Sequence, residues 1–249
     1  MRLTPSRGRL ALLALALVAF TPAPRASFTV YLVGDSTMVD KPDPTHNPER
    51  GWGLALPALF DSGVVVKKHP VNGRSARSFI AEARWNSVQH ALRPGDYVFI
   101  QFGHNDEKIE DTTPYAAPDG AYRPNLERFI HDTRAARATP VLFTPIVRRQ
   151  WSATGELTGT HGQYPAAVRA VAKQQGVQLI DLEQLTAEML KSYGAEKSKS
   201  LFVWTTEGQF PAFPLARSDN THLSPLGARL VAEIAARELR GALGAHVLK

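Results

Sequence analysis

Short apolar, β-branched segments alternate along the chain with longer segments in which apolar residues recur at helical spacing. The short segments predict strands at residues 29–33, 64–68, 97–102, 141–145 and 178–180. The longer segments predict helices at residues 54–60, 78–92, 126–138, 165–175, 182–193 and 225–243. Strands that alternate with helices in this order are expected to form a parallel sheet covered by helices on both faces.

Long segments without such periodicity separate some of these elements. They are residues 40–51, 108–123, 148–163 and 196–218. In an open parallel sheet, the loops that follow the strands are where ligands bind. We therefore expect these segments to form the walls of a site.

The first 26 residues differ in composition from the rest of the chain. Arginines at positions 2, 7 and 9 precede an apolar run at residues 10–20, and small residues and prolines follow up to Ala26. This is the layout of a secretory signal peptide, and the apolar run is shorter than the roughly 20 residues that cross a membrane. We expect residues 1–26 to be a cleaved signal peptide and residues 27–249 to form a single domain that is secreted or periplasmic.

Charge and cysteine content narrow the possible functions. The sequence has 29 Lys and Arg against 23 Asp and Glu, a net charge of +6; four arginines lie in the first 26 residues, which leaves 25 against 23, or +2. No basic run remains to neutralise a row of phosphates, which argues against a nucleic-acid partner. Because the chain has no cysteine, disulfides, thiolate catalysis and Cys-ligated zinc are excluded.

Polar residues with complementary chemistry follow three of the predicted strands and precede the last predicted helix. Ser36, Gly73 and Asn105 follow the first, second and third strands, so they should meet at one edge of the sheet. Asp219 and His222 precede the last helix. A serine nucleophile needs a base, and an imidazole base needs a carboxylate that fixes its tautomer. Backbone N–H groups of Ser36 and Gly73, with the Asn105 amide, are suited to bind the oxyanion that forms on an ester.

These residues also carry a resemblance to a known family. Gly34-Asp35-Ser36, Gly73, Gly103-His104-Asn105-Asp106, and Asp219 with His222 resemble, in order and character, the four blocks of the SGNH, or GDSL-type, hydrolase superfamily. Longer stretches resemble rhamnogalacturonan acetylesterases more narrowly: residues 31–37, 51–53, 72–75, 95–106, 144–149 and 160–165. The resemblance runs through residues 29–243.

The resemblance implies a fold, an activity and a set of roles. The fold is a flavodoxin-like three-layer α/β/α sandwich with a central parallel sheet of about five strands. Ser36 is the nucleophile, His222 the general base and acid, and Asp219 its orienting partner; Ser36, Gly73 and Asn105 form the oxyanion hole. The implied activity is removal of O-acetyl groups from pectic rhamnogalacturonan, without a cofactor or metal. Because residues 196–218 match no pattern of the family, acetylxylan and short-chain acyl esters stay open as alternative substrates.

An acidic polysaccharide would need positive groups at the site. Arg74 follows the second strand, and Arg148 and Arg149 follow the fourth, so we expect them at the mouth of the pocket. A guanidinium can hold a galacturonate carboxylate through two parallel hydrogen bonds. His161, in a long loop, is a further candidate for substrate contact. The partners expected are an acetylated polysaccharide or oligosaccharide, with no stable insertion into a membrane after signal cleavage; the oligomeric state is left open.

Two other classes of protein fit some of these residues. A metal-dependent phosphoesterase would use as ligands Asp35, His104, Asp106, Asp219 and His222. The sequence has no His-x-His or His-rich cluster to supply the remaining ligands. A non-catalytic carbohydrate-binding protein would stack sugars on Trp52, Trp85, Trp151 and Trp204. A pure binder has no physical need for a serine, an amide, a carboxylate and an imidazole in this arrangement.

Overall fold

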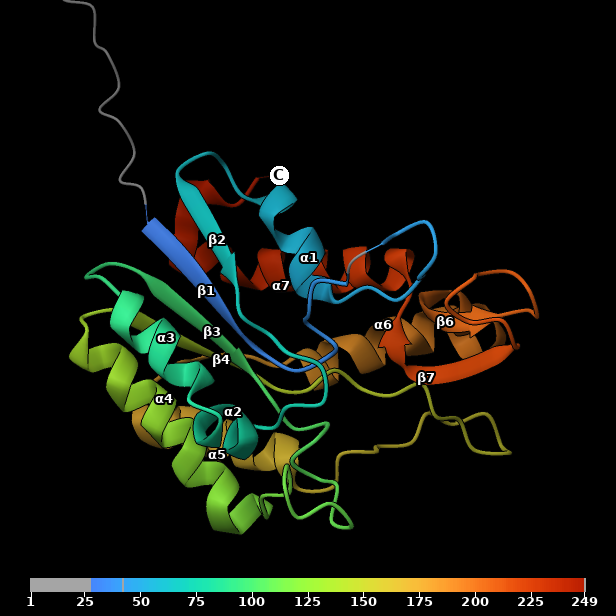
Figure 1. The fold of residues 1–249 in the computed structure, drawn as a ribbon, viewed down its shortest axis with the longest axis horizontal. Coiled ribbons are helices and arrows are strands. Elements are labelled where there is room, and N and C mark those ends of the chain that lie inside the picture. Colours follow the sequence, from blue (N-terminus) through green and yellow to red (C-terminus); the bar gives the residue numbers. More distant parts are fainter. Residues whose placement is uncertain (1–27, 42, 249) are drawn as a thin grey trace, which may run out of the picture.

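The computed structural model describes residues 28–41 and 43–248 (Figure 1). The signal peptide predicted at residues 1–26 lies outside the described residues. Within the described ranges, no helix is long and apolar enough to cross a membrane.

The central sheet has five parallel strands in the order β2-β1-β3-β4-β5. The strands are β1 (Phe28–Gly34), β2 (Val64–Lys68), β3 (Tyr97–Gln101), β4 (Thr139–Phe143) and β5 (Gln178–Ile180). All the strands predicted for this sheet are confirmed, with ends that differ by at most two residues, and so is the flavodoxin-like fold class. The chain leaves β1 for β2 on one side and returns to β3 on the other, which opens a crevice at the carboxyl ends of β1 and β3.

Alternate strand residues enter two separate hydrophobic cores, because successive side chains of a strand point to opposite faces. Val30, Leu32 and Phe99 pack in one core, whereas Tyr31 and Val98 pack in the other. The first core is covered by α1 (Trp52–Ala55), the 3₁₀ turn η1 (Leu56–Leu59), α6 (Leu182–Lys197) and α7 (Pro225–Leu243). The second is covered by α2 (Ala76–Ala81), α3 (Arg84–Ala91), α4 (Arg123–Ala135) and α5 (Tyr164–Gln175). Figure 1 shows these two helical layers on either side of the sheet.

The predicted helix at residues 78–92 is wrong as a single element, because it consists of α2 and α3. Ser75 begins α2, where its hydroxyl accepts a hydrogen bond from the Ser78 backbone N–H at 3.0 Å. Ala83 then adopts φ 57°, a left-handed conformation that interrupts the helix before α3. The helix predicted at residues 54–60 is also shorter, since α1 ends at Ala55 and Pro57 lies in the 3₁₀ turn η1.

A second, antiparallel sheet lies where part of a loop was predicted. It consists of β6 (Phe202–Thr205) and β7 (Arg217–Leu223), which follow the 3₁₀ turn η3 (Ser198–Leu201), and Figure 1 shows it beyond the carboxyl ends of the main strands. Phe202 pairs with Leu223, but Trp204 pairs with Ser218, so residues 219–222 bulge out opposite a single residue of β6. Bulges of this kind redirect side chains, and this one carries Asp219 and His222.

Candidate active site

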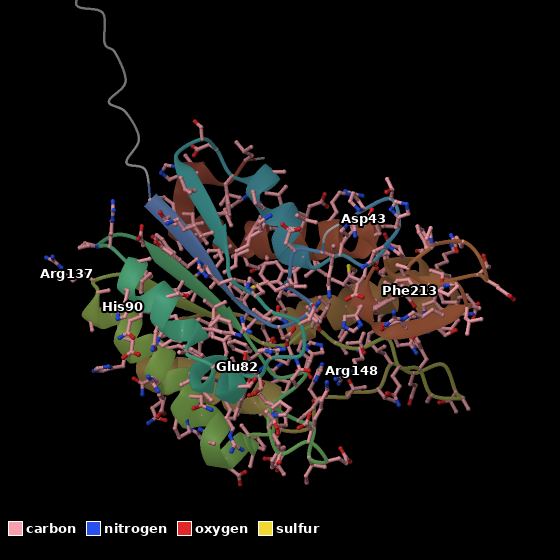
Figure 2. The ribbon with its side chains drawn as sticks, in the orientation of Figure 1. Asp43, Glu82, His90, Arg137, Arg148 and Phe213 are labelled. Atoms are coloured by element: carbon pink, nitrogen blue, oxygen red, sulfur yellow. The ribbon has the colours of Figure 1, made fainter. Side chains whose placement is uncertain are left out.

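A cavity of about 470 Å³ lies at the carboxyl ends of the central strands, where the bulge of β7 meets them. It is lined by Ser36, Lys41, Glu49, Asn72, Gly73, His104, Asn105, Lys108, Arg148, Asp219, Thr221 and His222. The structure thus brings together all the residues predicted for the triad and the oxyanion hole. In Figure 2 the labelled Arg148 marks this side of the molecule, while His90 and Arg137 lie toward the opposite end of the sheet.

A chain of hydrogen bonds connects Ser36, His222 and Asp219. His222 Nε2 lies 3.0 Å from Ser36 Oγ, and His222 Nδ1 lies 2.8 Å from Asp219 Oδ2. Burial opposes ionisation of Asp219, but hydrogen bonds from the ring and the backbone of His222 outweigh it and hold the pKa of Asp219 well below its usual value. A charged Asp219 favours the His222 tautomer with its proton on Nδ1, which leaves Nε2 able to accept the serine proton.

The turn that carries Ser36 is fastened by buried side chains. Asp35 Oδ1 accepts hydrogen bonds from the Thr37 backbone N–H at 2.9 Å and from Thr37 Oγ1 at 2.8 Å. Gln101 Nε2 donates to the same Thr37 hydroxyl at 2.8 Å. Asp35, Thr37 and Gln101 are fully buried, whereas Ser36 lines the pocket. Asp35 therefore stabilises the conformation of the turn, while the serine hydroxyl makes its hydrogen bond with His222.

Asn105 and Gly73 lie in the wall of the same pocket. Asn105 Nδ2 donates to the carbonyl oxygen of Arg74 at 3.0 Å, which fixes the amide and leaves it a second N–H for a ligand. Gly73 has φ 73°, a conformation that a residue with a Cβ rarely adopts. Asp106 Oδ1 accepts from the Ala76 backbone N–H at 3.0 Å and so ties the turn after β3 to the segment after β2. Burial raises the pKa of Asp106 well above its usual value.

Arg149 stabilises the bulge of β7 through backbone and side-chain hydrogen bonds. Its backbone N–H donates to the Asn220 carbonyl at 2.9 Å, its Nη1 to Asn220 Oδ1 at 3.1 Å, and its Nε to Ser198 Oγ at 3.1 Å. The guanidinium also lies over the ring of Trp204, 4.9 Å from its centre. The expectation that Arg149 lies at the pocket mouth is wrong, because its side chain is buried among these groups.

The other three residues expected at the mouth differ in their position relative to the pocket. Arg148 lines the pocket, where it pairs with Glu107 at 2.5 Å. His161 does not line it: it is 1% exposed and its ring lies between the Ile146 carbonyl at 2.8 Å and Glu107 at 2.9 Å, so direct substrate contact is wrong for this residue. Arg74 also lies outside the lining, because its side chain pairs with Glu82 at 3.0 Å.

The residues of the two rival classes are placed differently from what those classes need. Trp52 and Trp85 are fully buried, one in each hydrophobic core, and Trp204 lies beneath Arg149, so these three offer no open stacking face at the pocket. Asp35 and His104 contact each other at 3.3 Å. Over residues 28–41 and 43–248, no group of three or more His, Asp or Glu residues is arranged to hold a metal ion.

Five lining residues were not predicted from the sequence: Lys41, Glu49, Asn72, Lys108 and Thr221. Lys41 and Glu49 form a buried ion pair, and Lys41 also contacts Asn72. Lys41 and Glu49 lie in segment 40–51, which was expected only as a wall of the site. No local pattern marks either residue, because their pairing depends on how the loop folds back on itself.

The fold and the pocket are those of a GDSL-type hydrolase, and comparison with known proteins agrees. The chain belongs to the GDSL-like Lipase/Acylhydrolase family, which it matches over residues 32–230. It is an esterase of that type.

Three individual proteins are similar to this chain in sequence or in structure. The chain is 40% identical over 207 residues to the rhamnogalacturonan acetylesterase RhgT of Bacillus subtilis (strain 168), covering 83% of this chain and 87% of that protein. The crystal structure of the Bacillus subtilis protein YxiM has a TM-score of 0.76 at 25% identity, covering 89% of this chain and 58% of the YxiM chain. A catalytic mutant of the acetylxylan esterase Axe2 from Geobacillus stearothermophilus has a TM-score of 0.60 at 18% identity, covering 86% and 94%, and shares the fold.

Proposed function

We propose that the protein is a secreted serine carbohydrate esterase that removes O-acetyl groups from pectic rhamnogalacturonan through an acetyl-serine intermediate. The observation that carries the chemistry is the Ser36–His222–Asp219 chain of hydrogen bonds, in one pocket with Asn105 and Gly73. The 40% identity to a rhamnogalacturonan acetylesterase supports the substrate. The composition of residues 1–26 supports export.

In the acylation step, Ser36 Oγ attacks the carbonyl carbon of the acetyl ester while its proton passes to His222 Nε2. Asp219 stabilises the imidazolium that forms. The carbonyl oxygen becomes an oxyanion, which accepts hydrogen bonds from the backbone N–H groups of Ser36 and Gly73 and from the Asn105 amide. The bond between the carbonyl carbon and the sugar oxygen then breaks, and His222 donates its proton to that oxygen.

Deacylation uses the same residues, with water as the nucleophile and Ser36 as the leaving group. A water molecule gives its proton to His222 Nε2 as its oxygen attacks the acetyl carbonyl carbon. The bond to Ser36 Oγ breaks, the proton on His222 passes to the serine, and acetic acid leaves and loses its remaining proton to bulk water. Apart from the substrate and this water molecule, the proposed steps use side chains and backbone N–H groups of this chain.

Positive groups at the pocket support an acidic polymer as substrate. Lys108 is exposed in the wall of the pocket, and Arg148 lies in the same wall with Glu107 as its partner. Because the chain after residue 26 carries only +2, a general positive field does not account for binding of a polyanion. We assign galacturonate recognition to Lys108 and Arg148.

The proposal is tested by measuring acetate release from acetylated rhamnogalacturonan, acetylated xylan and a short-chain acyl ester, with the wild type and with Ser36→Ala. We expect the highest kcat/KM on rhamnogalacturonan and a loss on the order of 10⁶-fold in the variant. Mass spectrometry of the wild type, quenched during turnover, should show an acetyl group on Ser36. Faster release from xylan would move the assignment to acetylxylan esterases, and near-normal turnover by Ser36→Ala would refute the nucleophile.

A further inference from the structure

A buried ion pair forms part of the pocket wall beside His222. Lys41 Nζ contacts both Glu49 Oε1 and Asn72 Oδ1, and the side chains of Lys41 and Glu49 are 6% and 11% exposed. Glu49 Oε1 also lies 3.7 Å from His222 Nε2, the nitrogen that faces Ser36. A buried ion pair loses hydration that the mutual attraction often fails to recover. A gain in folding stability therefore does not explain why this ion pair is present. Its position in the wall of the pocket suggests a role in binding.

Backbone contacts fix Glu49 in this position. The next residue, Arg50, donates its N–H to the Leu223 carbonyl at 2.9 Å, and the two residues form an antiparallel bridge. Asn47 Oδ1 accepts from the Glu49 backbone N–H at 2.8 Å. The loop that carries Glu49 is thus held in register with the strand that carries His222. This pairing fixes the position of the Glu49 backbone relative to the His222 backbone.

We infer that Glu49, held by Lys41, is a specificity-determining residue that binds the hydroxyl group next to the acetyl ester on the sugar. This inference rests on the proposed function. During acylation the leaving sugar oxygen must lie within hydrogen-bond distance of His222 Nε2 to receive the proton. A hydroxyl on the adjacent ring carbon lies about one hydrogen-bond length from that oxygen. It therefore falls within reach of the Glu49 carboxylate, which lies 3.7 Å from the same nitrogen.

The chemistry of the pair selects a hydroxyl over other groups. An ionised carboxylate only accepts hydrogen bonds, and an ammonium only donates them. The contact of Glu49 with Lys41 is made through Oε1, and the carboxylate has a second oxygen, while Lys41 has three N–H donors for two observed contacts. The pair offers one acceptor and one donor, which matches a hydroxyl. A substrate carboxylate would be repelled by Glu49 and an ammonium by Lys41, so this subsite differs from the Lys108 and Arg148 side of the pocket.

The test compares two pyranoside monoacetates that differ only in the neighbouring position, one with a free hydroxyl and one with hydrogen there. The wild type should prefer the hydroxyl compound by about 10- to 100-fold in kcat/KM, the range expected for a hydrogen bond to a charged group. Glu49→Gln should bring this ratio close to one, and Lys41→Met should lower it in the same direction. Glu233→Gln, which removes a carboxylate from an exposed ion pair on α7, is the matched control and should leave the ratio unchanged.

The outcomes separate the subsite from the proposed function. Equal wild-type rates on the two sugar acetates would overturn the subsite while the acetylesterase assignment stands. A loss in Glu49→Gln by the same factor on both compounds would also overturn it, because the carboxylate would then act through His222 alone. Hydrolysis of phenyl acetate with no activity on either sugar acetate would overturn the subsite and the carbohydrate assignment together.

Discussion

The serine side and the histidine side of the proposed triad are held by different kinds of structure. Ser36 follows β1, an inner strand that pairs with both β2 and β3, and buried Asp35, Thr37 and Gln101 fasten its turn. Asp219 and His222 lie in a bulge of a two-stranded sheet that is separate from the central one. Strand pairing and core packing therefore position the nucleophile, whereas a few polar contacts position its base.

The contrast indicates which substitutions will separate activity from stability. On the serine side, changes beneath the turn also disturb the central sheet and both cores. On the histidine side, the bulge depends on Arg149 and on the bridge between Arg50 and Leu223. We expect changes there to lower turnover while the central sheet stays folded.

The largest effect is expected from Asp219→Asn. Asp219 Oδ1 accepts from the backbone N–H groups of Thr221 and His222, which an asparagine oxygen can still do, whereas the ion pair between Oδ2 and Arg217 is lost. The amide nitrogen that replaces Oδ2 cannot accept from His222 Nδ1, and the imidazole loses the tautomer that serves Ser36. We expect kcat on an acetyl ester to fall about 10⁴-fold, with circular dichroism unchanged. A loss under tenfold would refute the orienting role of Asp219.

An intermediate effect is expected from Arg149→Leu. It removes the guanidinium and its hydrogen bonds to Asn220, Ser198 and the Ala195 carbonyl, which should cost about 1.5 to 3 kcal/mol of unfolding free energy. Because a small shift of His222 relative to Ser36 weakens proton transfer, kcat should fall by up to about 10²-fold, with a smaller change in KM. Arg149→Lys should not restore it, since an ammonium lacks the planar set of donors.

The matched control for Arg149→Leu is Arg169→Leu. Arg169 makes hydrogen bonds to Asp181 and Glu183 away from the bulge. Its loss should lower the melting temperature without a change in kcat. If both variants lost stability and neither lost turnover, the bulge would not depend on Arg149 as described.

Most of the serine side could be predicted from the sequence, because it depends on local patterns. The central strands are short apolar segments, and Ser36, Gly73 and Asn105 follow three of them directly. The histidine side could be predicted only in part. Asp219 and His222 are close in sequence, but β7 reads Arg-Ser-Asp-Asn-Thr-His-Leu, without the apolar alternation that marks a strand. Its pairing with β6 is a tertiary contact that no local pattern shows.

The adjacent residues Arg148 and Arg149 show why side-chain roles were harder to predict than positions. Both follow β4 in a segment that forms neither helix nor strand, so no side-chain periodicity predicts which way each one points. In the structure Arg148 lines the pocket, while Arg149 is buried against Trp204. The sequence predicts where this segment lies, but which of the two arginines meets the substrate depends on the packing of β6 and β7.

On the serine side, the titration of His104 is expected to change stability and to have the smallest effect on turnover. Burial lowers the pKa of His104 to about 4, against the opposing charge of Asp35, whereas the unfolded chain takes up this proton near 6.5. As pH falls from 6.5 to 4, the unfolded state binds a proton that the folded state refuses, so the free energy of unfolding should fall by at most about 3 kcal/mol.

Titration of Asp106 changes the free energy of unfolding in the opposite direction. The contribution of His104 must therefore be obtained as a difference between two proteins that both contain Asp106. The raised pKa of Asp106 lets the folded state keep a proton that the unfolded state loses above 3.8, which lowers stability as pH rises. Urea unfolding of the wild type and of His104→Gln across this window cancels the Asp106 contribution, and the difference reports on the His104–Asp35 pair, because His104 also lowers the pKa of Asp35. The stability of the wild type relative to the variant should decrease toward low pH. A difference that stays flat would mean that His104 takes up its proton equally in the folded and unfolded states, despite its burial against Asp35.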